Sequence, residues 1–158
     1  MILPLLRSTR PRHWVKNVVV LAAVTFSEHL FDVAFVLTAA MAAGVFVLLS
    51  SAVYLINDLA DVEADRLHPD KATRPIASGD LPRPVAAVAA AVLVAGGLAG
   101  AAALHTDFAL VAATYAALNL AYSLGLKRAA LVDILMVAAG FLLRAVGGAV
   151  VIEVDIST

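Results

Sequence analysis

The sequence predicts an all-α membrane protein, a bundle of about five transmembrane helices, and three observations support that prediction. Of the 158 residues, 63% are hydrophobic and 15% are charged, whereas soluble domains average roughly 45–50% apolar and about 25% charged residues. The mean hydropathy is +0.97. The apolar residues gather in five blocks, and a helix needs about 20 such residues to cross a bilayer. A soluble domain and a disordered chain are therefore excluded.

The five blocks follow one another along the chain, and we treat residues 1–158 as a single transmembrane domain. The first block is short and carries Lys16 and Asn17 at its start, so it is the weakest of the expected spans. Alanine and glycine are abundant throughout, which allows helices to approach one another closely in lipid. The five expected spans are Val15–Phe26, Val33–Ile56, Pro84–Leu104, Phe108–Leu124 and Ala129–Ile152.

The connections between the blocks alternate in their content of lysine and arginine. Ten of the eleven lysines and arginines lie before or at the start of the first block or in the connections after the second and fourth blocks. The connections that contain Glu28 and His105 hold none, and neither does the stretch that ends at Thr158. Cytoplasmic loops are rich in positive charge. We therefore expect a multi-pass protein of the cell membrane with a cytoplasmic N-terminus and cytoplasmic basic connections.

The composition also excludes several kinds of function. There is no cysteine, so disulfide scaffolds and cysteine-ligated metal centres are ruled out. The formal net charge is −1, which gives no general attraction to nucleic acid. The expected partners are the lipid bilayer and small charged ligands at its surface.

The second block ends in a group of carboxylates that favours a metal site. On a continuing helix, Asp58, Asp61 and Asp65 lie at i, i+3 and i+7 and share one face. Carboxylate oxygens suit Mg²⁺, which combines them with substrate phosphates, and Asn57 adds a neutral amide. We predict that the three aspartates form the catalytic metal site. The alternative is a solvated loop in which opposite charges neutralise one another.

Cations follow this acidic group at once, among them Lys71 and Arg74. The next residues, Pro75 through Gly79, are stiffened by the proline and ended by the glycine. Carboxylates for a metal followed by cations for phosphate oxygens are the pattern expected of a diphosphate site. We therefore predict that Asn57, Lys71 and Arg74 bind substrate.

Further polar residues lie in or beside the other apolar blocks. An ionisable group inside a span is costly and is by default functional, so Arg144, on the same helix face as Asp133, is a candidate phosphate ligand. The alternative for Arg144 is an internal pair with a carboxylate. Three of the other candidates have alternatives as well: snorkelling for Lys16, an interfacial anchor or packing residue for Tyr122, and a topology signal for Lys127. The other substrate-binding candidates are Lys16, Asn17, Tyr122 and Lys127.

Several motifs together resemble the UbiA-type intramembrane prenyltransferases. The aspartate pattern that begins at Asn57 and the run from His68 to Gly79 match the first aspartate-rich motif of that superfamily. The stretches Arg10–Asn17, Tyr122–Arg128 and Asp133–Ala145 also agree. The set is most similar to the branch that includes the decaprenyl-phosphate phosphoribosyltransferases.

The resemblance implies a fold of usually nine transmembrane helices around a polar cavity open to the cytoplasm, with two aspartate-rich motifs and Mg²⁺. For this branch it implies phosphoribosyl diphosphate as donor and a polyprenyl (decaprenyl) phosphate as acceptor, in the synthesis of a cell-wall polysaccharide precursor. One alternative is a prenyltransferase that moves a polyprenyl group from its diphosphate to an aromatic or quinone precursor. A second is a non-catalytic membrane module.

The second aspartate-rich motif of this family would lie beyond Thr158. We therefore expect the chain to be the N-terminal part of a longer protein, or a half-site that needs a partner.

Overall fold

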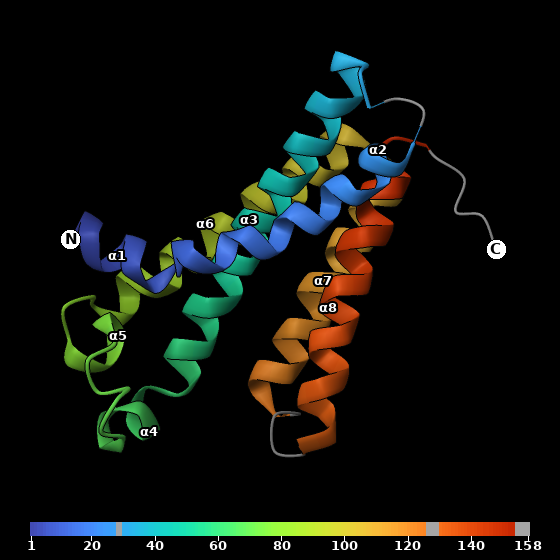
Figure 1. The fold of residues 1–158 in the computed structure, drawn as a ribbon. Coiled ribbons are helices and arrows are strands. Elements are labelled where there is room, and N and C mark those ends of the chain that lie inside the picture. The colour runs from blue at the N-terminus through green and yellow to red at the C-terminus, as the bar shows by residue number, and fades with distance from the viewer. Residues whose placement is uncertain (28–29, 126–129, 154–158) are drawn as a thin grey trace.

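The computed structural model describes residues 1–27, 30–125 and 130–153, and the regular elements in these ranges are all helices. The predicted all-α class is therefore confirmed (Figure 1). The expectations for Lys127, Arg128, Glu28 and Thr158 fall outside the described residues. The elements are α1 (Ile2–Ser8), the 3₁₀-helix η1 (Pro11–Leu21), α2 (Ala22–Phe26), α3 (Val33–Ala60), α4 (Val62–Leu67), α5 (Pro75–Ser78), α6 (Arg83–Leu104), α7 (Thr106–Leu124) and α8 (Ala130–Val151).

Four helices in the described part of the chain are long and apolar enough to cross a membrane: α3, α6, α7 and α8. They correspond to the second to fifth predicted blocks, and their ends fall close to the predicted ones. The largest difference is in α3, which continues past Ile56 to Ala60 and so carries Asn57 and Asp58 within its last turns. The beginning of the predicted metal site is therefore part of a membrane helix.

The first predicted block differs from the others because it is split between η1 and α2. Helix η1 begins before this block, at Pro11; its eleven residues rise about 2 Å each, and the five residues of α2 add about 1.5 Å each. The combined length of about 30 Å approaches the thickness of the hydrocarbon core. The same residues in an α-helix would fall several ångströms short, so the tighter winding lengthens this segment.

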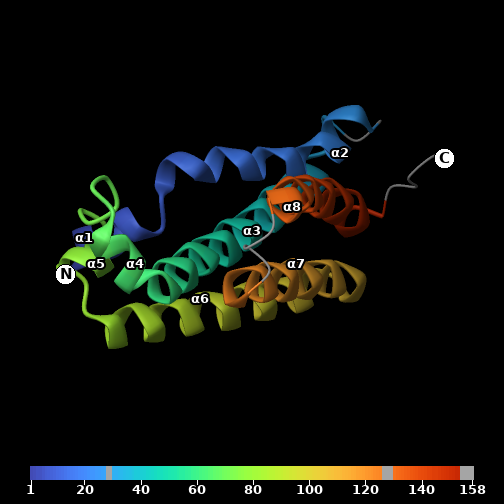
Figure 2. The same ribbon diagram turned by 90° about the horizontal axis from the view of Figure 1, so that it is seen from below.

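Helix α3 is the central element, with η1 on one side and α6 on the other (Figure 2). It also contacts α7 and α8. The main core lies where these helices meet: Phe46 of α3 is fully buried and makes edge-to-face contacts with Phe108 and Tyr115 of α7. This core fixes the positions of α7 and α8 relative to the part of α3 that carries Asn57 and Asp58.

Glycines allow three of the closest helix contacts. A Cβ on Gly97 of α6 would lie 2.7 Å from Leu49 of α3, and one on Gly147 would lie 2.9 Å from the Phe46 ring. A Cβ on Gly148 would overlap the backbone carbonyl of Val20, because α8 and η1 approach to backbone contact there. The small residues thus let helices pack through close approach, as expected in lipid.

A second apolar cluster supports the end of α3 that carries the aspartates. Leu5 of α1 packs against it, and its buried members are Leu55, Val62, Ile76, Leu81, Ala86 and Ala90. The cluster joins α3, α4, α5 and α6, so α1, α4 and α5 gather at one end of the bundle (Figure 1). It holds the connection after α3 in a defined position beside the membrane helices.

Candidate functional site

The predicted metal ligands lie where α3 ends and α4 begins. Helix α3 bends at Asp61, whose φ and ψ are −99° and 3°. The backbone nonetheless keeps a helical hydrogen-bond pattern: the Asp61 amide donates to the Asn57 carbonyl at 3.0 Å, and the Asp65 amide donates to the Asp61 carbonyl at 2.8 Å. The continuity expected from the i, i+3, i+7 spacing is therefore largely kept through the bend, and Asp58 and Asp65 still reach the same partner.

That shared partner is Arg74, which stands just before α5. Its Nη1 donates to Asp65 Oδ2 at 2.7 Å and to Asp58 Oδ1 at 3.2 Å. Both carboxylates are only 3% exposed, whereas Arg74 is 29% exposed. Buried carboxylates need a compensating cation, and Arg74 supplies one positive charge to both aspartates.

Arg10 supplies the second cation, and the sequence analysis did not place it among the site residues. Its Nη2 donates to Asp58 Oδ1 at 2.7 Å, and its guanidinium lies 4.6 Å from the centre of the Tyr54 ring. Arg10 has a left-handed backbone, with φ of 52° and ψ of 64°, which costs roughly 1–2 kcal/mol for a residue other than glycine. The feature of the sequence from which Arg10 could have been found is the basic stretch before Pro11. We call Arg10, Asp58, Asp65 and Arg74 the acidic cluster.

The remaining members of the predicted charged segment are more exposed. Lys71 lies on the exposed turn between α4 and α5, and Asp61 is half-buried at the bend. Glu63 is exposed and bonds to Arg83 at 2.6 Å and to Arg66 at 3.3 Å. The hydrogen bond from Arg83 is the main reason that the pKa of Glu63 lies below its ordinary value. The outer pair of Glu63 and Arg83 is separate from the acidic cluster.

A polar cavity of about 390 Å³ opens next to the cluster, between η1, α3, α7 and α8. It brings together residues that are far apart in the sequence, and four of them were predicted to bind substrate: Lys16, Asn57, Tyr122 and Arg144. Tyr54 lies on its wall and also stacks on Arg10, so the cavity and the acidic cluster adjoin. The other lining residues are Val53, Tyr115, Asn119, Asp133, Met136, Val137, Gly140 and Phe141.

Arg144 is 8% exposed and is held by neutral groups. Its Nε donates to Asn17 Oδ1 at 2.7 Å, Nη2 to the Tyr115 hydroxyl at 2.8 Å and Nη1 to the Gly140 carbonyl at 2.8 Å. Among the residues that the structure describes, no carboxylate pairs with it. The alternative of an internal carboxylate pair therefore finds no support there, and Arg144 presents a positive charge that neutral dipoles orient.

The other candidates take different places around this arginine. Asn17 is 2% exposed, and its amide nitrogen is 3.5 Å from the Ser50 hydroxyl, so it lies behind Arg144 as a support. Tyr122 donates to Asp133 at 2.7 Å across the α7–α8 interface. Lys16 is exposed at the cavity. Tyr115 was not predicted as a site residue, because a tyrosine within an apolar helix does not indicate that its hydroxyl will bind an arginine such as Arg144.

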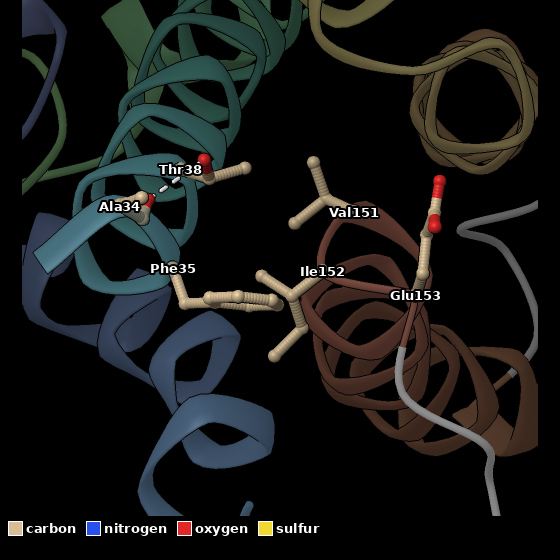
Figure 3. A pocket seen from close by; sticks show the side chains of 6 residues that line it. All are labelled: Ala34, Phe35, Thr38, Val151, Ile152 and Glu153. Atoms are coloured by element: carbon tan, nitrogen blue, oxygen red, sulfur yellow. Dashed lines mark hydrogen bonds between the residues drawn. The ribbon is translucent and has the colours of Figure 1, made fainter. Parts of the chain in front are cut away.

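Two other cavities differ in character. An apolar cavity of about 270 Å³ lies between α3, α6 and α7 and shares Val53 and Asn119 with the polar cavity. A cavity of about 340 Å³ lies where the start of α3 meets the end of α8 (Figure 3). The acidic cluster lies at the other end of α3. In this third cavity, Phe35 and Ile152 face each other, and Glu153 is the lone charged lining residue among those described. This third cavity contains none of the predicted site residues.

The aspartates fit a magnesium ion by the chemistry of their oxygens. No group of three or more potential metal ligands has converged among the described residues, and Asp58 and Asp65 face arginines. The donor set still consists of hard carboxylate oxygens fixed on neighbouring helical turns, which is what Mg²⁺ requires.

The fold and the site define a polytopic helical membrane protein with a charged, ligand-sized cavity at the end of its second span. The family model described as the UbiA prenyltransferase family matches residues 17–158. The chain therefore belongs to the UbiA prenyltransferase family.

Several curated relatives with similar sequences are named decaprenyl-phosphate phosphoribosyltransferase. The chain is 46% identical over 155 residues to the decaprenyl-phosphate phosphoribosyltransferase of Mycobacterium tuberculosis, covering 96% of this chain and 51% of the relative. It is 42% identical to the enzyme of that name from Corynebacterium glutamicum, covering 97% and 47%. The chain thus spans about half the length of the curated relatives it matches.

Solved structures share the fold at low sequence identity. A UbiA homologue from Archaeoglobus fulgidus, bound to GPP and Mg²⁺, superposes with a TM-score of 0.78 at 22% identity, covering 98% of this chain and 56% of that one. A structure of digeranylgeranylglyceryl phosphate synthase gives a TM-score of 0.80 at 19% identity, covering 95% and 53%. The described helices correspond to about half of each structure.

Proposed function

We propose that this chain contributes the first half of the site of a Mg²⁺-dependent membrane transferase. The reaction moves a 5-phosphoribosyl group from phosphoribosyl diphosphate to a polyprenyl phosphate. The identity of 42–46% to decaprenyl-phosphate phosphoribosyltransferases over almost the whole chain is the main support. The acidic cluster and the polar cavity agree with it, because they provide separate places for a diphosphate and for further phosphate groups.

The acidic segment would hold the donor. Asp58, Asp61 and Asp65 would ligate Mg²⁺, with Arg74 and Lys71 on the diphosphate oxygens and Asn57 as a neutral partner. When bound, the metal supplies charge stabilisation for the departing diphosphate. A lipid phosphate oxygen attacks the anomeric carbon, the carbon–oxygen bond to diphosphate breaks, and diphosphate leaves with the bonding electrons. The chain's cations stabilise the negative charge that develops on it.

The polar cavity would hold the other phosphates. Arg144 has its geometry fixed by Asn17 and Tyr115, so its charge is available to an incoming phosphate without reorganisation. Lys16 and Tyr122 lie on the same wall, and Lys127 would add a further cation for the lipid phosphate. The apolar cavity that shares Val53 and Asn119 with the polar one offers a surface for the lipid tail.

A cytoplasmic location of the site belongs to the same proposal. Arg10, Arg74 and Arg83 lie at the end of the bundle where α1, α4 and α5 gather (Figure 1), which agrees with the positive-inside rule. Reporter fusions at Thr106 and Gly125 should report opposite sides of the membrane, with Thr106 outside. Equal signals from both fusions would contradict the orientation.

The test of the reaction uses the full-length membrane protein. It is given Mg²⁺, polyprenyl phosphate and ribose-labelled phosphoribosyl diphosphate, and we expect label in the lipid phase that disappears when the metal is chelated. The second candidate is prenyl transfer, because this chain shares its fold with the GPP-bound homologue. Consumption of an allylic diphosphate with an aromatic acceptor, and no label in lipid, would favour that candidate instead.

A further inference from the structure

We infer that Arg10 is an exchangeable counter-ion: it neutralises Asp58 when the site is empty and turns to the donor diphosphate when the metal complex binds. This inference rests on the proposed function and extends it to a residue of the N-terminal segment. The observation that carries it is the direct ion pair of 2.7 Å between Arg10 and a carboxylate that is 3% exposed.

The first step in the argument is the charge balance of the acidic cluster. Two buried carboxylates face two guanidinium groups, so the formal charges of these four side chains sum to zero. A divalent cation on the same carboxylates would add two positive charges to a place with little water. Like charges that cannot be hydrated repel strongly. Metal binding therefore requires either that a guanidinium leaves or that an anion arrives.

The second step concerns which arginine can leave. Arg74 bonds to both Asp58 and Asp65 and precedes α5, which the second apolar cluster holds in place. Arg10 pairs with one carboxylate, Asp58, while the two arginines are almost equally exposed, at 28% and 29%. Arg10 also stands between α1 and η1 with a left-handed backbone, so its present position is not the relaxed one. Arg10 is therefore the cation that can exchange more easily.

The third step is where the guanidinium goes. Diphosphate oxygens accept bidentate hydrogen bonds from arginine, and a diphosphate bound through the metal would stand beside the carboxylates that Arg10 now contacts. The side chain then keeps an anionic partner while Asp58 becomes available to the metal. This exchange makes the metal and the diphosphate bind with positive cooperativity, because each one removes a cost that the other faces.

The experiment compares two binding constants of the purified full-length protein. One is the affinity for Mn²⁺ alone, measured from the loss of the free-ion signal in electron paramagnetic resonance. The other is the affinity for inorganic pyrophosphate at saturating Mg²⁺, measured by calorimetry. For Arg10→Gln we expect opposite changes, each of about tenfold, a size typical of coupling between sites. Mn²⁺ alone should bind more tightly, and magnesium pyrophosphate should bind more weakly.

Two further variants keep the result interpretable. Arg83→Gln is the matched control, because Arg83 also pairs with a carboxylate near this segment, but with the exposed Glu63, and it should leave both constants unchanged. Arg10→Lys keeps the charge, so both constants should return toward those of the unaltered protein. A variant that simply folds poorly would weaken both kinds of binding together.

The outcomes separate this inference from the proposed function. If Arg10→Gln leaves Mn²⁺ binding unchanged or weakens it, Arg10 only ties the N-terminal segment to α3, and the inference is wrong. It is also wrong if the unaltered protein binds Mn²⁺ equally well with and without pyrophosphate. If the opposite shifts appear and label never reaches lipid in the transfer assay, the counter-ion role stands and the phosphoribosyl donor is wrong.

Discussion

The two charged regions on either side of Tyr54 differ in how their charge is compensated. In the acidic cluster, Asp58 and Asp65 are neutralised by two arginines at 2.7–3.2 Å. In the polar cavity, Arg144 is oriented by an amide, a phenol and a carbonyl, with no described carboxylate beside it. The charges of the acidic cluster are balanced without a ligand, whereas the charge of Arg144 in the polar cavity is not. Substitutions in the acidic cluster should therefore reduce stability most, and substitution of Arg144 should reduce anion binding most.

The largest expected effect on stability comes from the acidic cluster. Asp58→Ala leaves Arg10 without its carboxylate and Arg74 with only one. Breaking a buried ion pair costs about 3–5 kcal/mol, and we expect about 3 kcal/mol here because both arginines are partly hydrated. Thermal unfolding of the full-length protein in detergent measures it. A midpoint equal to that of the unaltered protein would show that the cluster does not stabilise the fold.

The next largest effect is on activity and comes from Arg144. Arg144→Gln keeps a hydrogen-bonding side chain near Asn17 and Tyr115 but removes the charge. We expect lipid labelling to fall about 100-fold, as when one well-placed donor to a developing anion is lost, with little change in unfolding temperature. If the variant instead unfolds early and retains its specific activity, the contrast between the two regions is wrong.

A smaller effect tests whether the cavity depends on the approach of α8 to η1. Gly148→Ala places a methyl group against the Val20 carbonyl and should cost about 1–3 kcal/mol, as overpacking does. Because Asn17 and Arg144 are joined across this contact, labelling should fall as well. Gly96→Ala is the control, since a Cβ at Gly96 meets nothing within 4 Å, and it should behave like the unaltered protein.

The smallest effect is expected at the exposed pair of Glu63 and Arg83. The pKa of Glu63 is lowered from 4.5, chiefly by the hydrogen bond from Arg83. Any contribution to stability is therefore present above that ordinary value and is lost as the pH falls through the lower folded-state pKa. Glu63→Gln should leave the unfolding temperature at pH 7 almost unchanged, because exposed pairs contribute little. A large drop at pH 7 would give the outer pair a structural role.

Much of this site could be predicted from sequence because its parts are local. Asp58, Asp61 and Asp65 follow one helical stripe at spacings of three and four residues, and the cations that follow are close in the chain. The membrane helices were predictable for a similar reason, since 20 apolar residues have few other stable states in a bilayer. The first span differs from its prediction, because no feature of the sequence Val15–Phe26 indicates that its first part forms a 3₁₀-helix.

The partners of the arginines could not be predicted in the same way. Arg10 lies 48 residues from Asp58, and Arg144 lies 127 residues from Asn17, so no spacing rule connects them. The sequence alone determined the class, the helices and the acidic stripe, because each follows from local hydrophobicity or helical periodicity. The family was recognisable from sequence through a different signal, the resemblance of its motifs. The tertiary structure alone decided which cation neutralises which carboxylate, and that Arg144 meets only neutral partners among the described residues. Those choices depend on helix contacts such as that between Gly148 and Val20, which bring distant residues within hydrogen-bonding distance.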